Sequence, residues 1–342
     1  MPTVLSVAYP FAPVTADPVG GAEQVLGHLD HALAAAGWRS VVIAAEGSQV
    51  AGELRSVPTV AGEIDGPARE VVHAAVRERI ARTLGDTNVD LIHLHGIDFG
   101  AYLPTTAVPV LATLHLPVSW YAEGALRPRP GVRLLPVSAS QARTAPPELD
   151  LLPPIENGVA LDYPRLTRRS FALVLGRICP EKGAHHALEA AKAADASLII
   201  AGEVYPYPEH QRYFEAEVRP RLDGRRRWVG PARGARKRRL VAAARCVLIP
   251  STAPETSSLV AREAAAAGTP VVAFRSGALP ETVEHGRTGL IVNDALEMAQ
   301  AIRAIDAIDP AVCRAVARER FALRRMTDEY LALYGCLIAG AA

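Results

Sequence analysis

Residues 250–292, PSTAPETSSLVAREAAAAGTPVVAFRSGALPETVEHGRTGLIV, are the stretch that decides the fold. The four apolar residues 246–249 come just before it, and the proline that ends them is typical of the exit of a buried parallel strand. After a polar loop, residues 259–267 form an alanine-rich run that a glycine ends, which predicts a helix. Residues 270–274 are again apolar and predict the next buried strand. The stretch is therefore a strand–loop–helix–strand unit of a parallel α/β sheet.

The loop and helix start of this stretch carry candidate binding groups. Glu255 lies on the loop and Glu263 on the predicted helix. The backbone amides at the helix start have no carbonyl acceptor within the helix, and such amides favour an anion. They belong to Ser257, Ser258, Leu259 and Val260. Amides together with two carboxylates suit a ligand that has both phosphates and sugar hydroxyls. An ordinary helix start, with glutamates that only complement the helix dipole, is the alternative.

Composition limits the class of protein. The chain has 342 residues, of which 49% are apolar, and a net charge of +1. Its length suits two domains, and its apolar content argues against disorder. The near-neutral charge argues against a positive electrostatic field strong enough to bind nucleic acid. We find no apolar run of membrane-spanning length and expect no signal peptide, because no basic region precedes the first apolar residues. The widely spaced Cys179, Cys246, Cys313 and Cys336 predict buried free thiols of a reducing, cytoplasmic compartment rather than zinc ligands.

The first half of the chain alternates predicted strands and helices. A short strand at residues 4–8 is followed by Gly20 and Gly21 and a helical pattern, a geometry that lets the backbone approach a phosphate, although a plain turn into a helix is the alternative. Two later predicted strands end at His95 and His115. A doubly wound sheet binds its ligands at the carboxyl ends of its strands, so both histidines are candidate ligand contacts. A packed or hydrogen-bonded histidine without a catalytic role is the alternative. The aromatic residues of the loop 116–133 are candidates for stacking on a ring of the ligand; a packed lid or filling of the core is the alternative.

The second half begins a new series of strands at residues 172–175. The loop that follows reads GRICPEKG from Gly176, and its Arg177 and Lys182 suit a diphosphate, the first as a bidentate fork and the second as a point charge. A structural salt bridge is the alternative. Further strand ends lie at Gly202, Glu203 and Gly230.

A dense basic segment covers residues 225–239. Nucleic-acid binding is one interpretation of it. The near-neutral total charge and the lack of interleaved aromatic residues favour a solvated helix face near an anionic ligand.

These motifs, taken in order, resemble one known family. Glu255 and Glu263, followed by AAGTPVVA and GALPETVEHGRTGLIV, and preceded by GRICPEKG, resemble the nucleotide-sugar half of retaining glycosyltransferases of family 4. GGAE at residues 20–23 and ATLH, ending at His115, resemble segments of the other half. Where the family usually has Gly-Phe-Gly after the first glutamate, this chain has Thr-Ser-Ser at residues 256–258.

The resemblance implies the α/β GT-B fold, in which two doubly wound parallel-sheet (Rossmann-like) domains face each other across a cleft. We expect an acceptor-side domain at residues 1–162, completed by a terminal helix at 322–342, and a nucleotide-sugar-binding domain at 163–321. The implied activity is retaining, metal-independent transfer of a sugar from a nucleoside-diphosphate sugar to a small-molecule or glycoside acceptor. The short chain and its composition bias favour a natural-product enzyme, and the resemblance implies a role in antibiotic biosynthesis. A nucleotide-sugar 2-epimerase on the same fold, or a nucleotide-binding protein without activity, are the alternatives.

The resemblance also implies roles for single residues. His115 reaches the transferred sugar, Glu255 its hydroxyls, and Arg177 and Lys182 the leaving diphosphate. Other donor-binding residues are expected to be Gly20, Gly21, Gly176, Gly202, Glu203, Gly230, Ser257, Ser258, Leu259, Val260 and Glu263. We expect no cofactor, no metal ligand, since the chain has no D-x-D pair, and no nucleic-acid partner.

Overall fold

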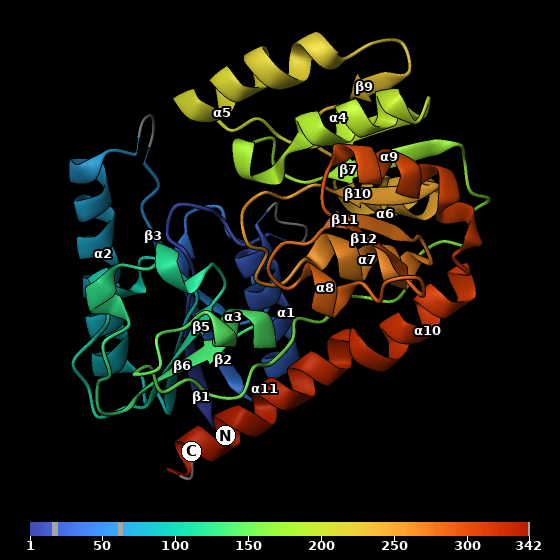
Figure 1. The fold of residues 1–342 in the computed structure, drawn as a ribbon. Coiled ribbons are helices and arrows are strands. Elements are labelled where there is room, and N and C mark those ends of the chain that lie inside the picture. Colours follow the sequence, from blue (N-terminus) through green and yellow to red (C-terminus); the bar gives the residue numbers. More distant parts are fainter. Residues whose placement is uncertain (16–19, 61–63, 341–342) are drawn as a thin grey trace. The chain divides into compact units, whose positions relative to one another are not determined.

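The computed structural model describes residues 1–15, 20–60 and 64–340. The chain divides into two compact units (Figure 1): unit 1 is Met1–Asn157 with Arg324–Ala342, and unit 2 is Gly158–Leu323. The first boundary therefore falls at Asn157 where residue 162 was predicted, and the last two residues of the predicted segment 322–342 lie outside the described residues. No helix in the described part of the chain is long and apolar enough to cross a membrane.

Unit 1 is built on a six-stranded sheet in the order β3-β2-β1-β4-β5-β6, with every neighbouring pair parallel. Its strands are β1 (Thr3–Val7), β2 (Arg39–Ala45), β3 (Glu53–Val57), β4 (Leu91–Leu94), β5 (Val110–Leu114) and β6 (Val132–Pro136). The order reverses between β1 and β4, as in a doubly wound sheet, so ligand-binding loops are expected after these two strands.

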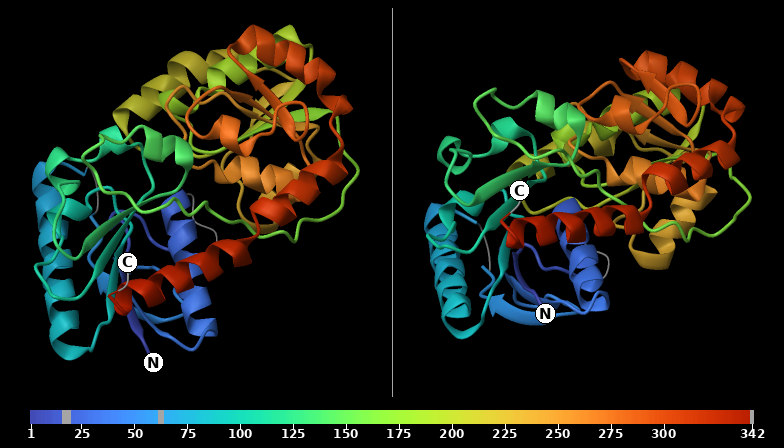
Figure 2. Two further views of the ribbon diagram at one scale, coloured as in Figure 1. Left: turned by 60° about the horizontal axis from the view of Figure 1, so that its bottom comes forward. Right: turned by 90° about the horizontal axis from the view of Figure 1, so that it is seen from below.

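Helices cover both faces of this sheet. Alternate residues of β2 point to opposite sides: the side of Val41 packs with α2 (Gly66–Asp86) and the side of Val42 with α1 (Gly21–Ala35). A short α3 (Ala139–Arg143) follows β6. The C-terminal helix α11 (Leu323–Ile338) shares the face of α1 (Figure 2), where the buried Tyr334 hydroxyl lies 2.7 Å from Nδ1 of His93 on β4.

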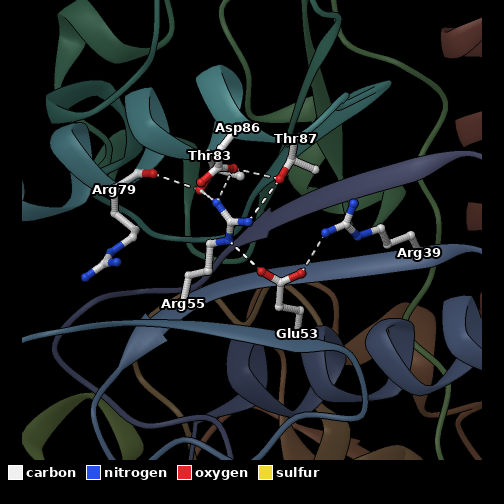
Figure 3. A network of polar contacts seen from close by, with 7 residues as sticks. All are labelled: Arg39, Glu53, Arg55, Arg79, Thr83, Asp86 and Thr87. Carbon is white, nitrogen blue, oxygen red and sulfur yellow. Dashed lines mark hydrogen bonds and ion pairs between the residues drawn. The ribbon is translucent and has the colours of Figure 1, made fainter.

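Charged groups hold the edge strand β3, which the sequence analysis did not predict. Its Arg55 bonds to Glu53 at 2.8 Å, to Asp86 at 2.6 Å and to Thr87 at 2.9 Å, and so ties β3 to the end of α2 (Figure 3). Glu53 also pairs with Arg39 on β2 at 2.9 Å. The strand was missed because polar contacts, rather than an apolar run, hold it in place.

The C-terminal segment begins after a break between two helices, because α10 (Pro310–Arg320) ends before Phe321 and α11 starts at Leu323. Phe321 packs in unit 2, where the Val159 amide donates to its carbonyl at 2.8 Å and the Leu323 amide donates to the carbonyl of Val159 at 3.0 Å. Cys336 is exposed rather than buried, because it lies on the solvent face of α11.

Unit 2 repeats the same topology in the order β12-β11-β10-β7-β8-β9, again with all neighbours parallel. Its strands are β7 (Phe171–Leu175), β8 (Ser197–Ala201), β9 (Arg226–Trp228), β10 (Cys246–Ile249), β11 (Val271–Phe274) and β12 (Gly289–Val292). Besides α10, its helices are α4 (Ala184–Ala193), α5 (Pro208–Tyr213), α6 (Gly234–Ala243), α7 (Leu259–Ala267), α8 (Leu279–Thr282) and α9 (Ala295–Ala304). The predicted architecture of two doubly wound parallel sheets is confirmed.

Candidate functional site

The predicted diphosphate loops of unit 2 meet where the strand order of its sheet reverses. β7 and β10 are neighbours, so the loop that starts at Gly176 and the loop that starts at Pro250 leave the same edge of the sheet side by side. Gly183 shows how closely they pack: its φ is +62°, and a Cβ there would lie 2.3 Å from the carbonyl oxygen of Pro250. Only glycine fits such an approach. The fold therefore brings Arg177 and Lys182 to the loop that carries Glu255.

An ion pair joins these two loops. The ammonium group of Lys182 lies 2.6 Å from Oε1 of Glu255, and the hydroxyl of Ser251 donates to the same oxygen at 2.5 Å. Burial disfavours the charged form of Glu255, but the charge and hydrogen bond of Lys182, the Ser251 hydroxyl and the charge of Arg177 together lower its pKa below the ordinary value. Glu255 is therefore an anion at neutral pH. Arg177 makes no ion pair with any described residue, so its guanidinium is available to a phosphate.

A glycine that the sequence analysis did not single out fixes the backbone of Glu255. Gly277, in the loop after β11, has a φ of +54°, and a Cβ there would lie 2.2 Å from the carbonyl oxygen of Glu255. The next amide, of Ala278, donates to that oxygen at 2.6 Å. The position of Glu255 thus depends on a third loop of the same sheet edge. The signal for it was present in the glycine of GALPE after a predicted strand.

The start of α7 has the predicted form. Ser258 is its N-cap, with extended backbone and a side chain that accepts a hydrogen bond from the Ala261 amide. The amides of Leu259 and Val260 are the first two of the helix, ahead of any intrahelical acceptor. They come just after the Glu255 loop, and the dipole of the helix adds to their preference for an anion.

Glu263 is buried and has a partner that was not foreseen. Its side chain is 5% exposed, and its Oε1 lies 3.1 Å from the ammonium group of Lys237 on α6. Lys237 had been predicted only as a member of the basic segment. The pair joins two helices across 26 residues of sequence, so no local pattern could have revealed it.

Most of the basic segment is neutralised within unit 2. Its ion pairs are Arg225–Asp195, Arg226–Asp223, Arg233–Glu203, Lys237–Glu263 and Arg238–Asp162. This pairing favours the solvated-helix interpretation over a nucleic-acid interface, which needs a field of uncompensated positive charge.

The remaining predicted donor residues of unit 2 lie together at the ends of β8 and β9. The Gly202 amide donates to the carbonyl of Gly230 at 3.0 Å, and the indole nitrogen of Trp228 donates to the carbonyl of Gly202 at 2.9 Å. Glu203 pairs with Arg233 at 3.2 Å. Because β8 neighbours β7, this group flanks the Gly176 loop, whose first amide donates to Ala201 at 3.1 Å.

In unit 1, the glycines predicted to approach a phosphate form the start of α1. Gly20 is its N-cap and Gly21 its first residue. The buried carboxylate of Glu23 lies over this turn, so close that a Cβ on Gly20 would be 1.7 Å from its Oε2. A phosphate would reach the turn only after this carboxylate moved.

His115 follows β5 and forms a pair with His95, which follows β4. Nε2 of His115 lies 3.0 Å from Nδ1 of His95, and the rings are stacked, with an interplanar angle of 15°. Burial lowers the pKa of His115 to about 4 and that of His95 well below its ordinary value, so both are neutral at pH 7. Among the aromatic residues of the loop 116–133, Tyr121 is buried in the core and offers no ring surface to a ligand. The side chain of Trp120 is 44% exposed.

Comparison with known proteins places both halves of the chain. Residues 19–144 match the family described as Glycosyltransferase Family 4, and residues 169–306 match Glycosyl transferases group 1. The chain is similar to the glycogen synthase of Mycobacterium tuberculosis, with 28% identity over 96% of this chain and 91% of the relative.

Solved structures share the whole fold. A glycosyltransferase involved in avilamycin A biosynthesis is 24% identical, with a TM-score of 0.73 over 100% of this chain and 99% of its own. HepE of Anabaena, solved in complex with UDP and glucose, is 18% identical, with a TM-score of 0.76 over 97% of this chain and 99% of its own. The two doubly wound sheets thus have the predicted GT-B fold.

Proposed function

Since this chain is a family 4 glycosyltransferase, which transfers a sugar from a nucleotide sugar with retention, we propose that its acceptor is a small molecule or glycoside in natural-product (antibiotic) biosynthesis. We further propose that the transfer needs no metal ion at the reacting centre. The likeness to the avilamycin glycosyltransferase and the short, lysine-poor chain support the first proposal. The second is supported by the cationic groups that the donor loops already supply.

One observation carries the mechanism: Lys182, Glu255 and the start of α7 converge where the strand order reverses, with Lys182 and Glu255 2.6 Å apart. Arg177, Lys182 and the amides of Leu259 and Val260 would bind the donor diphosphate. They would also stabilise the charge that grows on it as the sugar leaves, as preorganised donors do at other developing anions.

The remaining side chains would position the sugar rather than attack it. Glu255 would accept hydrogen bonds from sugar hydroxyls remote from the reacting carbon, because it lies on the loop just before the phosphate-binding start of α7. His115, neutral at pH 7, would hydrogen-bond the transferred sugar. The departing phosphate oxygen would take the acceptor's proton on the face that it leaves, which gives retention without a glycosyl-enzyme.

The test uses the purified chain and a panel of nucleoside-diphosphate sugars, each with and without a panel of glycoside and aglycone acceptors. We expect release of nucleoside diphosphate that depends on the acceptor, is not raised by added Mg²⁺ or Mn²⁺, and yields a product with the anomeric configuration of the donor. Turnover that requires added Mg²⁺ or Mn²⁺ would refute metal independence at the reacting centre. Conversion of the donor sugar without an acceptor would instead identify an epimerase.

A further inference from the structure

A cluster of metal-binding side chains lies beside the diphosphate loop but outside the groups assigned above. One ligand atom from each of Cys179, Glu181 and His210 lies within 4.8 Å of the other two. Cys179 and Glu181 belong to the GRICPEKG loop, and His210 to α5. Cys179 is fully buried and His210 is 7% exposed, so the cluster is largely closed to solvent.

Two atoms of this cluster have no hydrogen-bond partner among the described residues, although both are buried: Oε2 of Glu181 and Nδ1 of His210. A buried polar atom without a partner costs about 1–3 kcal/mol, so native proteins rarely leave two of them side by side. A shared ligand that accepts electron pairs from both would remove this cost. We propose that Cys179, Glu181 and His210 hold a Zn²⁺ ion.

The donor set selects zinc. A thiolate and an imidazole favour Zn²⁺ over Mg²⁺ and Ca²⁺, which prefer oxygen ligands. Zinc bonds of about 2.0–2.3 Å at tetrahedral angles place ligand atoms about 3.5 Å apart, so side-chain rotations of about an ångström complete the site. Water fills the fourth position. Binding would release the thiol proton of Cys179 to the solvent, because the thiolate is the form that binds zinc.

The charge balance fits the surroundings. A thiolate and a carboxylate neutralise Zn²⁺, so the occupied site places no net charge next to Arg177, whose positive charge acts on all three ligands. Zinc would join the loop that carries Arg177 and Lys182 to α5, which follows β8 in the chain. The ion is thus a structural brace for that loop, and only this consequence rests on the proposed function.

The first measurement is the metal content of the full chain, prepared without chelator and loaded with zinc alone, then challenged with a chromogenic chelator. We expect about one tightly held zinc per chain in the wild type and in Cys336→Ser, which removes the exposed thiol. Cys179→Ser and His210→Gln should each weaken zinc binding at least 10-fold. Wild type that holds no zinc, or Cys179→Ser that binds it undiminished, would overturn the proposal.

A second readout keeps the test independent of catalysis and of folding losses. Cobalt substituted for zinc should give a thiolate charge-transfer band in the wild type and in Cys336→Ser, and none in Cys179→Ser. Removal of zinc from the wild type should raise amide exchange in residues 177–183 and 208–213 together. Exchange that stays unchanged in both segments, or a cobalt spectrum without a thiolate band, would refute a site built from these residues.

Discussion

The ion pair between Lys182 and Glu255 predicts opposite effects for its two halves. In the ligand-free chain the two side chains neutralise each other at 2.6 Å. Lys182→Met removes the point charge that we assign to the diphosphate, and Glu255→Gln removes the carboxylate that competes with that diphosphate for Lys182. The first change should therefore weaken binding of a nucleoside diphosphate, and the second should leave it unchanged or strengthen it.

The magnitudes follow from exposure. Loss of a desolvated charge contact costs about 2–5 kcal/mol, so Lys182→Met should weaken the diphosphate about 30-fold or more and the matching nucleoside hardly at all. The Lys182 side chain is 34% exposed and that of Glu255 11%, which puts the pair between a surface pair and a buried one. Unfolding should therefore become easier by about 1–2 kcal/mol in Lys182→Met. Glu255→Gln should tighten the diphosphate by at most about fivefold.

Calorimetric titration with the nucleoside diphosphate and the nucleoside, on both variants, gives the comparison, and chemical denaturation gives the stability change. Lys192→Met is the matched control, because Lys192 is an exposed lysine of the same unit. Glu255→Gln should still lower turnover of the donor sugar, since its role there is to hold hydroxyls. The reasoning fails if Glu255→Gln weakens the diphosphate as much as Lys182→Met does.

Three further predictions concern single groups. Arg177→Ala should weaken diphosphate binding far more than nucleoside binding, by about 2–5 kcal/mol, and equal losses in titration would contradict its assignment. We propose that Glu263 accepts hydrogen bonds from the ribose hydroxyls of the donor, so Glu263→Gln should weaken ribonucleotides more than their 2′-deoxy analogues, which calorimetry with both ligands tests. Burial lowers the pKa values of His93, His95 and His115, so below pH 6.5 the unfolded chain binds more protons than the folded one. Between pH 6.5 and 5 the free energy of unfolding should thus fall by up to about 1.4 kcal/mol per histidine and pH unit, and the thermal midpoint should fall with it. A midpoint that stays constant over that range would contradict the buried neutral state.

The parts of the fold that could be predicted are those with local signals. β10, α7 and β11 agree with the apolar runs and with the proline and glycine that bound them. β3 could not be predicted, because its place depends on Arg55 and its contacts with α2. The packing of Phe321, just before α11, could not be predicted either, because its partners in the core are Val159 and Val316.

The candidate site divides in the same way. Arg177 and Lys182 could be predicted because both residues lie in one short loop whose residue types suit a diphosphate. Their neighbours across the fold could not: Lys237 meets Glu263 from another helix, and His210 meets Cys179 after an intervening strand. Sequence patterns therefore found the loops of the site, and only the structure found which side chains each loop faces.

Glu255 and Glu263 each pair with a lysine, and they differ in whether a bound donor can replace them in that ion pair. Glu263 and Lys237 are 5% and 15% exposed, so separating them would leave a charge buried without compensation. Ribose hydroxyls carry no charge and cannot replace the lysine. On the proposed function, Glu263 would therefore keep Lys237 while its second oxygen accepts from the ribose. Lys182 is a third exposed, and a diphosphate can replace the carboxylate that it now binds. Glu255 then retains Ser251 and gains sugar hydroxyls in place of the ammonium group. We therefore expect donor binding to exchange one ion pair and to leave the other intact, so that the two carboxylates, eight positions apart in sequence, respond differently to the same ligand.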